Sequence, residues 1–188
     1  MRRNYLIYLF LFILFSGCAT TEDFVRPGTD FQKYKRIAVL PLSDFPLQSG
    51  SGMQVADIIE MELLKRGVDI VDRSRINQII TEQTVGLSGV INESTAPKVG
   101  ELLGVKCIMT GSINEYGTTV TNIQVVAGAA PAYMPVSTAG ITLKLIDTET
   151  SQIVWSASAR GSEIGNNVQA IAAKKAIIKT IDQFIRHF

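Results

Sequence analysis

Residues 141–161 read ITLKLIDTETSQIVWSASARG, and this stretch predicts an antiparallel β-hairpin. Its first half places Ile141, Leu143 and Leu145 on alternate positions, as in a strand with one buried face. Asp147 and Thr150 then bracket a tight turn, which their side chains are expected to build through hydrogen bonds to the backbone. Residues 152–159 complete the hairpin around Trp155.

Upstream of this hairpin, short apolar runs alternate with segments that have the apolar spacing of helices. The expected strands are residues 34–42, 68–71 and 105–116, and the expected helices are residues 53–66, 74–83, 94–103 and 166–188. This order predicts an α/β fold: a mixed β-sheet with helices packed mainly on one face, a β-hairpin extension and a C-terminal helix. The last helix is expected to turn five residues inward, namely Val168, Ile171, Ile178, Ile181 and Ile185.

The first residues predict an export signal. Arg2 and Arg3 precede an apolar run over residues 5–15, which is shorter than the roughly 20 residues of a membrane-spanning helix. Ser16 and Gly17 then lead to Cys18, the order expected of a lipoprotein signal peptide that is cleaved before a lipidated cysteine. An ordinary secretory signal with an incidental cysteine is the alternative.

The predicted cleavage divides the chain into a signal peptide (1–17), a lipidated tether (18–33) and one domain (34–188). Ala19, rather than aspartate, follows the cysteine, which predicts an outer-membrane lipoprotein on the periplasmic face. Several acyl chains, such as palmitate, would anchor the mature chain durably, at about 0.8 kcal/mol per buried methylene.

Composition and residue types argue against several functions. Removing residues 1–17 takes Arg2 and Arg3 from 18 basic residues and leaves 16 against 17 acidic ones, so no nucleic-acid partner is expected. Cys107 is the one cysteine left after Cys18, which rules out an internal disulfide in the mature chain. His187 is expected to be solvated near the chain end, no metal-ligand spacing or phosphate-binding motif is present, and the sequence predicts neither an enzyme nor a cofactor.

Four blocks, in order, resemble the CsgG family of curli production assembly and transport lipoproteins. They are RIAVLPLSDF (36–45), VDRSRINQIITEQTVGLSGVIN (71–92), KVGELLGVKCIMTGSINEY (98–116) and ITLKLIDTETSQIVWSASARG (141–161). The resemblance implies a homo-oligomeric, non-enzymatic assembly module with an unidentified partner in the cell envelope. Within the second block, Asp72 is expected to cap a helix and Arg73 to pair with a carboxylate across the sheet edge, for which Glu82 is a candidate.

The chain departs from the family's pore-forming members, in which the resemblance would imply two hairpins per subunit in a transmembrane barrel. Only one hairpin fits, between residues 116 and 141, and none fits in residues 160–165. The alternation of that hairpin is poor, and Pro131 and Pro135 are expected to interrupt its pairing.

The segment VVAGAAPAYMPV, residues 125–136, is apolar and uncharged, and it supplies the candidate interaction residues Val125, Val126, Ala129, Tyr133 and Met134. Three readings are open: a loop buried on its own domain, an exposed contact for a neighbouring copy or partner, or a hairpin tip that dips into the membrane.

Three functions therefore compete. The first is a membrane-tethered assembly or interaction module in envelope assembly or secretion, and the second is a reduced, curli-type secretion channel with one hairpin per subunit. The third is an activator of a cell-wall synthase, as in the penicillin-binding-protein activator lipoproteins with this type of domain. Those activators use a long linker, whereas residues 19–33 would span at most about 50 Å.

Overall fold

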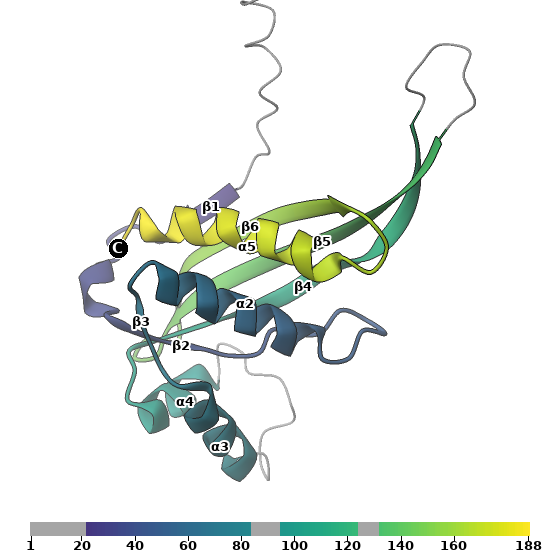
Figure 1. Ribbon diagram of the computed structural model, residues 1–188. Coiled ribbons are helices and arrows are strands. Elements are labelled where there is room, and N and C mark those ends of the chain that lie inside the picture. Colours follow the sequence, from purple (N-terminus) through teal and green to yellow (C-terminus); the bar gives the residue numbers. More distant parts are fainter. Residues whose placement is uncertain (1–21, 84–94, 124–131) are drawn as a thin grey trace, which may run out of the picture.

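The computed structural model describes residues 22–83, 95–123 and 132–188 (Figure 1). It contains a six-stranded sheet in the order β1-β6-β5-β4-β2-β3, in which β2 pairs in parallel with β3 and β4 and the other pairs are antiparallel. The mixed sheet and the α/β class predicted from the sequence are confirmed. The strands are β1 (Glu22–Val25), β2 (Arg36–Val39), β3 (Asp69–Ile70), β4 (Cys107–Ile123), β5 (Ala132–Asp147) and β6 (Ile153–Ile164).

The helices divide between the two faces of the sheet. The helices are α2 (Ser51–Lys65), α3 (Arg73–Gln83), α4 (Ala96–Leu103) and α5 (Gln169–Ile185), with a short 3₁₀ helix η1 at Phe31–Lys33. α2 and α5 bury the larger core, around Trp155, against one face, while α3 and α4 cover part of the other face around Ile108. β2 lies between the cores, and its Ile37 and Ala38 point into opposite ones, as the continuous apolar run predicts.

The buried face of α5 differs from the expected isoleucine stripe. Ile171 is 48% exposed, whereas Ala172, Ala173 and Ala176 are fully buried. A β-carbon added at Gly161 of β6 would lie 1.9 Å from the carbonyl oxygen of Ala172, so helix and strand touch backbone to backbone. Only small side chains fit at such a contact, and the helix is therefore turned so that its alanines meet the sheet.

The β4–β5 hairpin is longer than the sequence predicts. Its pairing runs without a gap from Glu115 opposite Gly140 to Ile123 opposite Ala132. Pro135 is part of it, so the expected interruption is wrong at this position. The carbonyl oxygen of Pro135 accepts a hydrogen bond from Gly165, and because N and C=O of one strand residue point to the same side, its missing N–H faces the β6 side and not β4. Pro131 lies outside the described residues.

Residues 22–33 do not form the free tether that was expected. β1 pairs with β6 from Glu22 opposite Ser158 to Val25 opposite Trp155, and η1 packs Phe31 into the core. Residues 22–33 are therefore part of the folded domain. In the part of the chain that the structure describes, no helix has the length and apolar character needed to cross a membrane.

Candidate functional site

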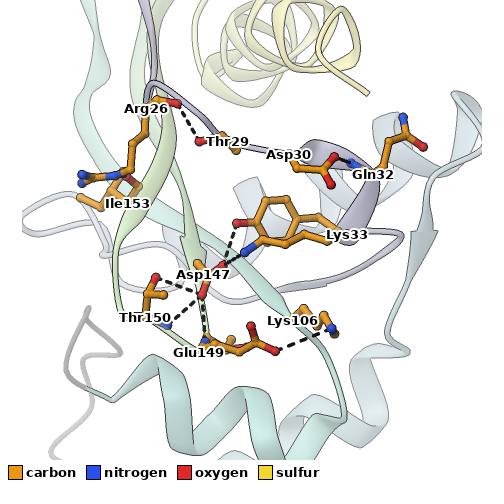
Figure 2. Close-up of polar contacts among 12 residues, drawn as sticks. Arg26, Thr29, Asp30, Gln32, Lys33, Lys106, Asp147, Glu149, Thr150 and Ile153 are labelled. Carbon is orange, nitrogen blue, oxygen red and sulfur yellow. Dashed lines mark hydrogen bonds and ion pairs between the residues drawn. The ribbon is translucent and has the colours of Figure 1, made fainter.

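Residues 22–34, here named the N-terminal strap, are fastened to one end of the sheet. After β1, the backbone N–H of Arg26 donates to the Val154 oxygen at 3.0 Å, and Arg26 Nε donates to the Ile153 oxygen at 2.9 Å. Thr29 closes the turn that follows, through a 2.7 Å bond from its hydroxyl to the Arg26 oxygen (Figure 2). These bonds hold the strap beside the start of β6.

Asp147, in the β5–β6 turn, is the polar centre of this attachment. Its Oδ2 accepts from Lys33 Nζ at 2.5 Å and from the Tyr34 hydroxyl at 2.7 Å. Its Oδ1 accepts from the backbone N–H groups of Glu149 and Thr150 at 2.9 and 2.8 Å and from the Thr150 hydroxyl at 3.0 Å (Figure 2). One carboxylate thus joins the turn to the strap.

The charge of Asp147 is strongly stabilised although the side chain is buried. Burial raises the pKa of Asp147, but the hydrogen bonds from Lys33, Tyr34 and Thr150 outweigh it and hold the pKa well below its usual range. Burial, and then the hydrogen bond to Asp147, raises the pKa of Tyr34 to about 12. The cluster therefore stays in one charge state across the neutral range.

The end of α5 holds the other side of the strap. Phe31 makes an edge contact with Phe184 and stacks on His187, with ring centroids 6.3 and 5.5 Å apart. His187 Nε2 also lies 3.0 Å from Asp23 Oδ2. His187 is thus not the solvated residue that the sequence suggests, because the strap lies against it.

Asp72 and Arg73 lie where β3 leads into α3. Asp72 Oδ1 accepts from the backbone N–H of Ser74 at 2.9 Å, at the start of the helix. Arg73 pairs with Glu60 at 2.6 Å and Asp57 at 3.3 Å, both on α2. The expected partner across the sheet edge is therefore wrong. The Glu82 side chain lies outside the described residues.

The candidate interaction residues belong to the far end of the β4–β5 hairpin. Val125, Val126 and Ala129 lie outside the described residues. Tyr133 and Met134 are in β5, where Tyr133 is 68% exposed and Met134 is half-buried. At Tyr133, the reading of this segment as a loop buried on its own domain is therefore wrong.

Sequence reasoning missed two other exposed apolar residues, which lie on the strands beside β5. Val120 in β4 is 66% exposed, and Ile164 at the end of β6 is 59% exposed. For Val120, the signal in the sequence is the absence of Asp, Glu, Lys and Arg from residues 116–143, a longer uncharged run than residues 125–136; Ile164 lies outside that run.

Two strand edges are open at this end of the sheet. In the described part of the chain, β4 has no strand on its outer side after the bridge between Ser112 and Ser43, and β1 covers β6 only up to Ser158. On the β6 edge, Lys175 Nζ and Lys179 Nζ donate to the carbonyl oxygens of Ser162 and Arg160, both at 3.2 Å. The outer ends of β4 and β5 thus extend beyond the helices (Figure 1), whereas the free edge of β6 lies beside α5, whose lysines bond two of its outward carbonyl oxygens.

A metal-binding arrangement is the next feature to consider. Among the described residues, no three His, Cys, Asp or Glu side chains are grouped so as to hold a metal ion. Cys107 is fully buried between β2 and β5, and burial raises the pKa of its thiol.

Comparisons with known proteins match this fold. The model of the family described as curli production assembly/transport component CsgG matches residues 29–181. The structure is similar to the PelC dodecamer from Paraburkholderia phytofirmans, at 16% identity over 86% of this chain and 94% of that one, with a TM-score of 0.54. It is also similar to lipoprotein GNA1162 from Neisseria meningitidis, at 16% identity over 80% of this chain and 98% of that one, with a TM-score of 0.56. No curated protein sequence matches the chain.

Proposed function

Because this chain belongs to the CsgG family, we propose that it is an outer-membrane lipoprotein that works without catalysis, as an assembly module built from several copies. The observation that carries the proposal is the pair of strand edges, on β4 beyond Ser112 and on β6 beyond Ser158, that pair with no further strand in the described part of the chain. An exposed edge is a template for pairing with another chain. The fold that the chain shares with a dodecameric protein supports the same conclusion.

The two edges differ, which favours a ring over a two-fold dimer. β4 and β6 both pair antiparallel with β5, so they run in the same direction. A rotation about an axis along the strands would place β6 of one copy beside β4 of the next, in a parallel ladder. Such a head-to-tail contact repeats until the ring closes, whereas antiparallel pairing of β6 with β6 would stop at two copies.

Blocking the β6 edge is expected to reduce the protein to a monomer. The carbonyl oxygen of Ser162 faces Lys175, so its N–H also points away from β5. Ser162→Pro therefore removes an outward donor and leaves the β5–β6 ladder intact, while the control Ser162→Ala keeps the donor. Light scattering in detergent should give an oligomer for the wild type and Ser162→Ala. A monomeric wild type, or an oligomeric proline variant, would contradict edge pairing.

Replacing Cys18 is expected to release the protein from the membrane. Cys18→Ser removes the thiol that would carry the lipid, so the variant should be lost from the membrane fraction and take up no labelled palmitate. The wild type should be found in the membrane fraction and carry the label. A wild-type protein that is unlabelled and found free in the periplasm would end the lipoprotein proposal.

The other two candidate functions give different results. A secretion channel predicts stepwise conductance when the purified oligomer is added to a planar bilayer, and we expect none. Against a synthase activator that reaches through the cell wall, the folded strap leaves only residues 19–21 between Cys18 and β1. At about 3.5 Å per residue, the reach from Cys18 to Glu22 is at most about 14 Å, far less than a free tether would give.

A further inference from the structure

The direction of β1 decides which end of the domain faces the membrane. Glu22 lies opposite Ser158 and Val25 opposite Trp155, while β6 runs from the Asp147 turn toward the open end. Because β1 is antiparallel to β6, the chain enters β1 from the open end of the sheet. A lipid on Cys18, four residues before Glu22, would therefore approach the domain from the side toward which the β4–β5 hairpin extends.

The hairpin reaches further in that direction than the anchor does. Ser158 lies opposite Thr142, and β5 continues from Thr142 outward to Ala132 for ten residues, or roughly 33 Å at about 3.3 Å per residue. Cys18 can reach at most about 14 Å from Glu22. Residues 118–123 and 132–137, here named the outer hairpin, lie beyond that limit by up to roughly 20 Å.

We propose that the outer hairpin rests in the headgroup layer of the leaflet that holds the lipid of Cys18. The inference rests on the proposed anchor and adds a second contact with the membrane. If the strands stand along the membrane normal, the outer hairpin enters the bilayer. If the strands are tilted away from the normal, the outer hairpin lies along the membrane surface. Either way the short reach of the anchor brings lipid to these residues.

The chemistry of the outer hairpin selects the headgroup layer. It carries no Asp, Glu, Lys or Arg, so contact with lipid buries no side-chain charge. β6 ends at the level of Thr119, so β6 of a neighbouring copy would leave the β4 edge open from Val120 to Ile123. The backbone groups of that edge need partners, and water among the headgroups supplies them whereas hydrocarbon does not. Tyr133 has the apolar ring and polar tip that favour this interface. Without charges, the contact should not depend on anionic lipid or on salt.

Fluorescence quenching tests the contact on the full, lipidated chain in vesicles of phosphatidylethanolamine and phosphatidylglycerol. Tyr133→Trp places an indole on the outer hairpin, and the native Trp155 is fully buried and gives the background. Leu64→Trp is the matched control: Leu64 is 53% exposed, and it lies near Arg66, which pairs with Asp182 at the far end of α5. Lipids with brominated acyl chains are the quencher.

The added emission is the fluorescence of a variant minus that of the wild type, which comes from Trp155. We expect brominated lipid to remove at least half of the added emission of Tyr133→Trp and none of the added emission of Leu64→Trp. We expect the same degree of quenching in vesicles without phosphatidylglycerol, because the contact should not depend on anionic lipid. Quenching of Tyr133→Trp that does not exceed that of Leu64→Trp would overturn the proposal. So would an added emission of Tyr133→Trp that is shielded from both brominated lipid and aqueous iodide, because that describes a contact between copies.

Labelling of the same samples with palmitate separates this inference from the proposed function. A labelled, vesicle-bound protein without quenching overturns only the contact of the outer hairpin. An unlabelled protein that does not bind vesicles overturns the anchor and, with it, the contact.

Discussion

Replacing Asp147 with alanine is expected to lower the free energy of unfolding by about 3 kcal/mol. The change leaves the buried Tyr34 hydroxyl, Lys33 and two turn N–H groups without their shared acceptor, and removing one member of a buried charged pair has a cost of this size. For a chain of this length, that corresponds to a fall of roughly 6–12 °C in Tm. Calorimetry on the Cys18→Ser form, which needs no detergent, measures it.

Glu149→Ala is the matched control. Glu149 lies in the same turn, but its pairing with Lys106 at 3.6 Å joins two side chains that are about 60% exposed. Exposed pairs contribute about 0–1 kcal/mol, so the control should keep its Tm within roughly 4 °C. Equal losses in the two variants would mean that the turn, rather than the buried carboxylate, determines stability.

The same carboxylate predicts a dependence of stability on acid. The folded-state pKa of Asp147 is depressed below its unfolded value, near 4, so its contribution is fully present above about pH 4 and is lost as the pH falls toward the folded value. Chemical unfolding at pH 7, 4 and 3 should therefore show falling stability. In Asp147→Asn that fall should be smaller, and an identical pH profile would contradict the assignment.

Replacing Gly161 with valine is expected to cost about 3 kcal/mol or more in unfolding free energy. Any β-carbon at this position would lie 1.9 Å from the Ala172 oxygen and 2.9 Å from the Ala176 nitrogen, so α5 must move away from β6. Overpacking of a closed core typically costs 1–3 kcal/mol, and here the obstacle is backbone that cannot rotate aside. Thermal unfolding should also show a loss of cooperativity, since α5 packs on the strap as well.

Gly117→Val provides the comparison in the same sheet. A β-carbon at Gly117 has no heavy atom within 4 Å, and valine suits a strand, so its Tm should equal or exceed that of the wild type. If the two glycine variants unfold alike, the close approach of helix and strand is not what Gly161 provides.

Elements with a buried face could be predicted from the sequence, and elements without one could not. β2 and the Asp147 hairpin carry clear apolar patterns, and both lie close to where the sequence places them. The far half of β4 carries Thr118 and Thr119, then Thr121 and Asn122, so polar residues fall on both faces and leave no period to detect. β1 consists of the four residues EDFV, which are too few and too polar to form a pattern. Its pairing with β6 depends on the tertiary structure, because the two strands are far apart in the sequence.

The candidate site was harder to predict, because its contacts join distant segments. The spacing of Asp147 and Thr150 indicates a turn, but nothing near them in the sequence indicates Lys33 and Tyr34 as partners. The isoleucine spacing of α5 predicted that its bulky face packs on the sheet. The face that does pack there is determined by Gly161, which lies on β6. Arg73 likewise finds its carboxylates on α2 rather than near its own strand.

The strap also determines how the domain bears load. If the chain is pulled through residue 22, the tension acts along β1 and opposes β6, which lies antiparallel beside it. The force then loads all the β1–β6 hydrogen bonds at the same time, in shear, and does not break them one after another. Force that is transmitted past β1 is then resisted by the Arg26 bonds and by the bonds from Lys33 and Tyr34 to Asp147. If the proposed lipid on Cys18 holds the protein, a pull on that anchor therefore leaves the sheet closed.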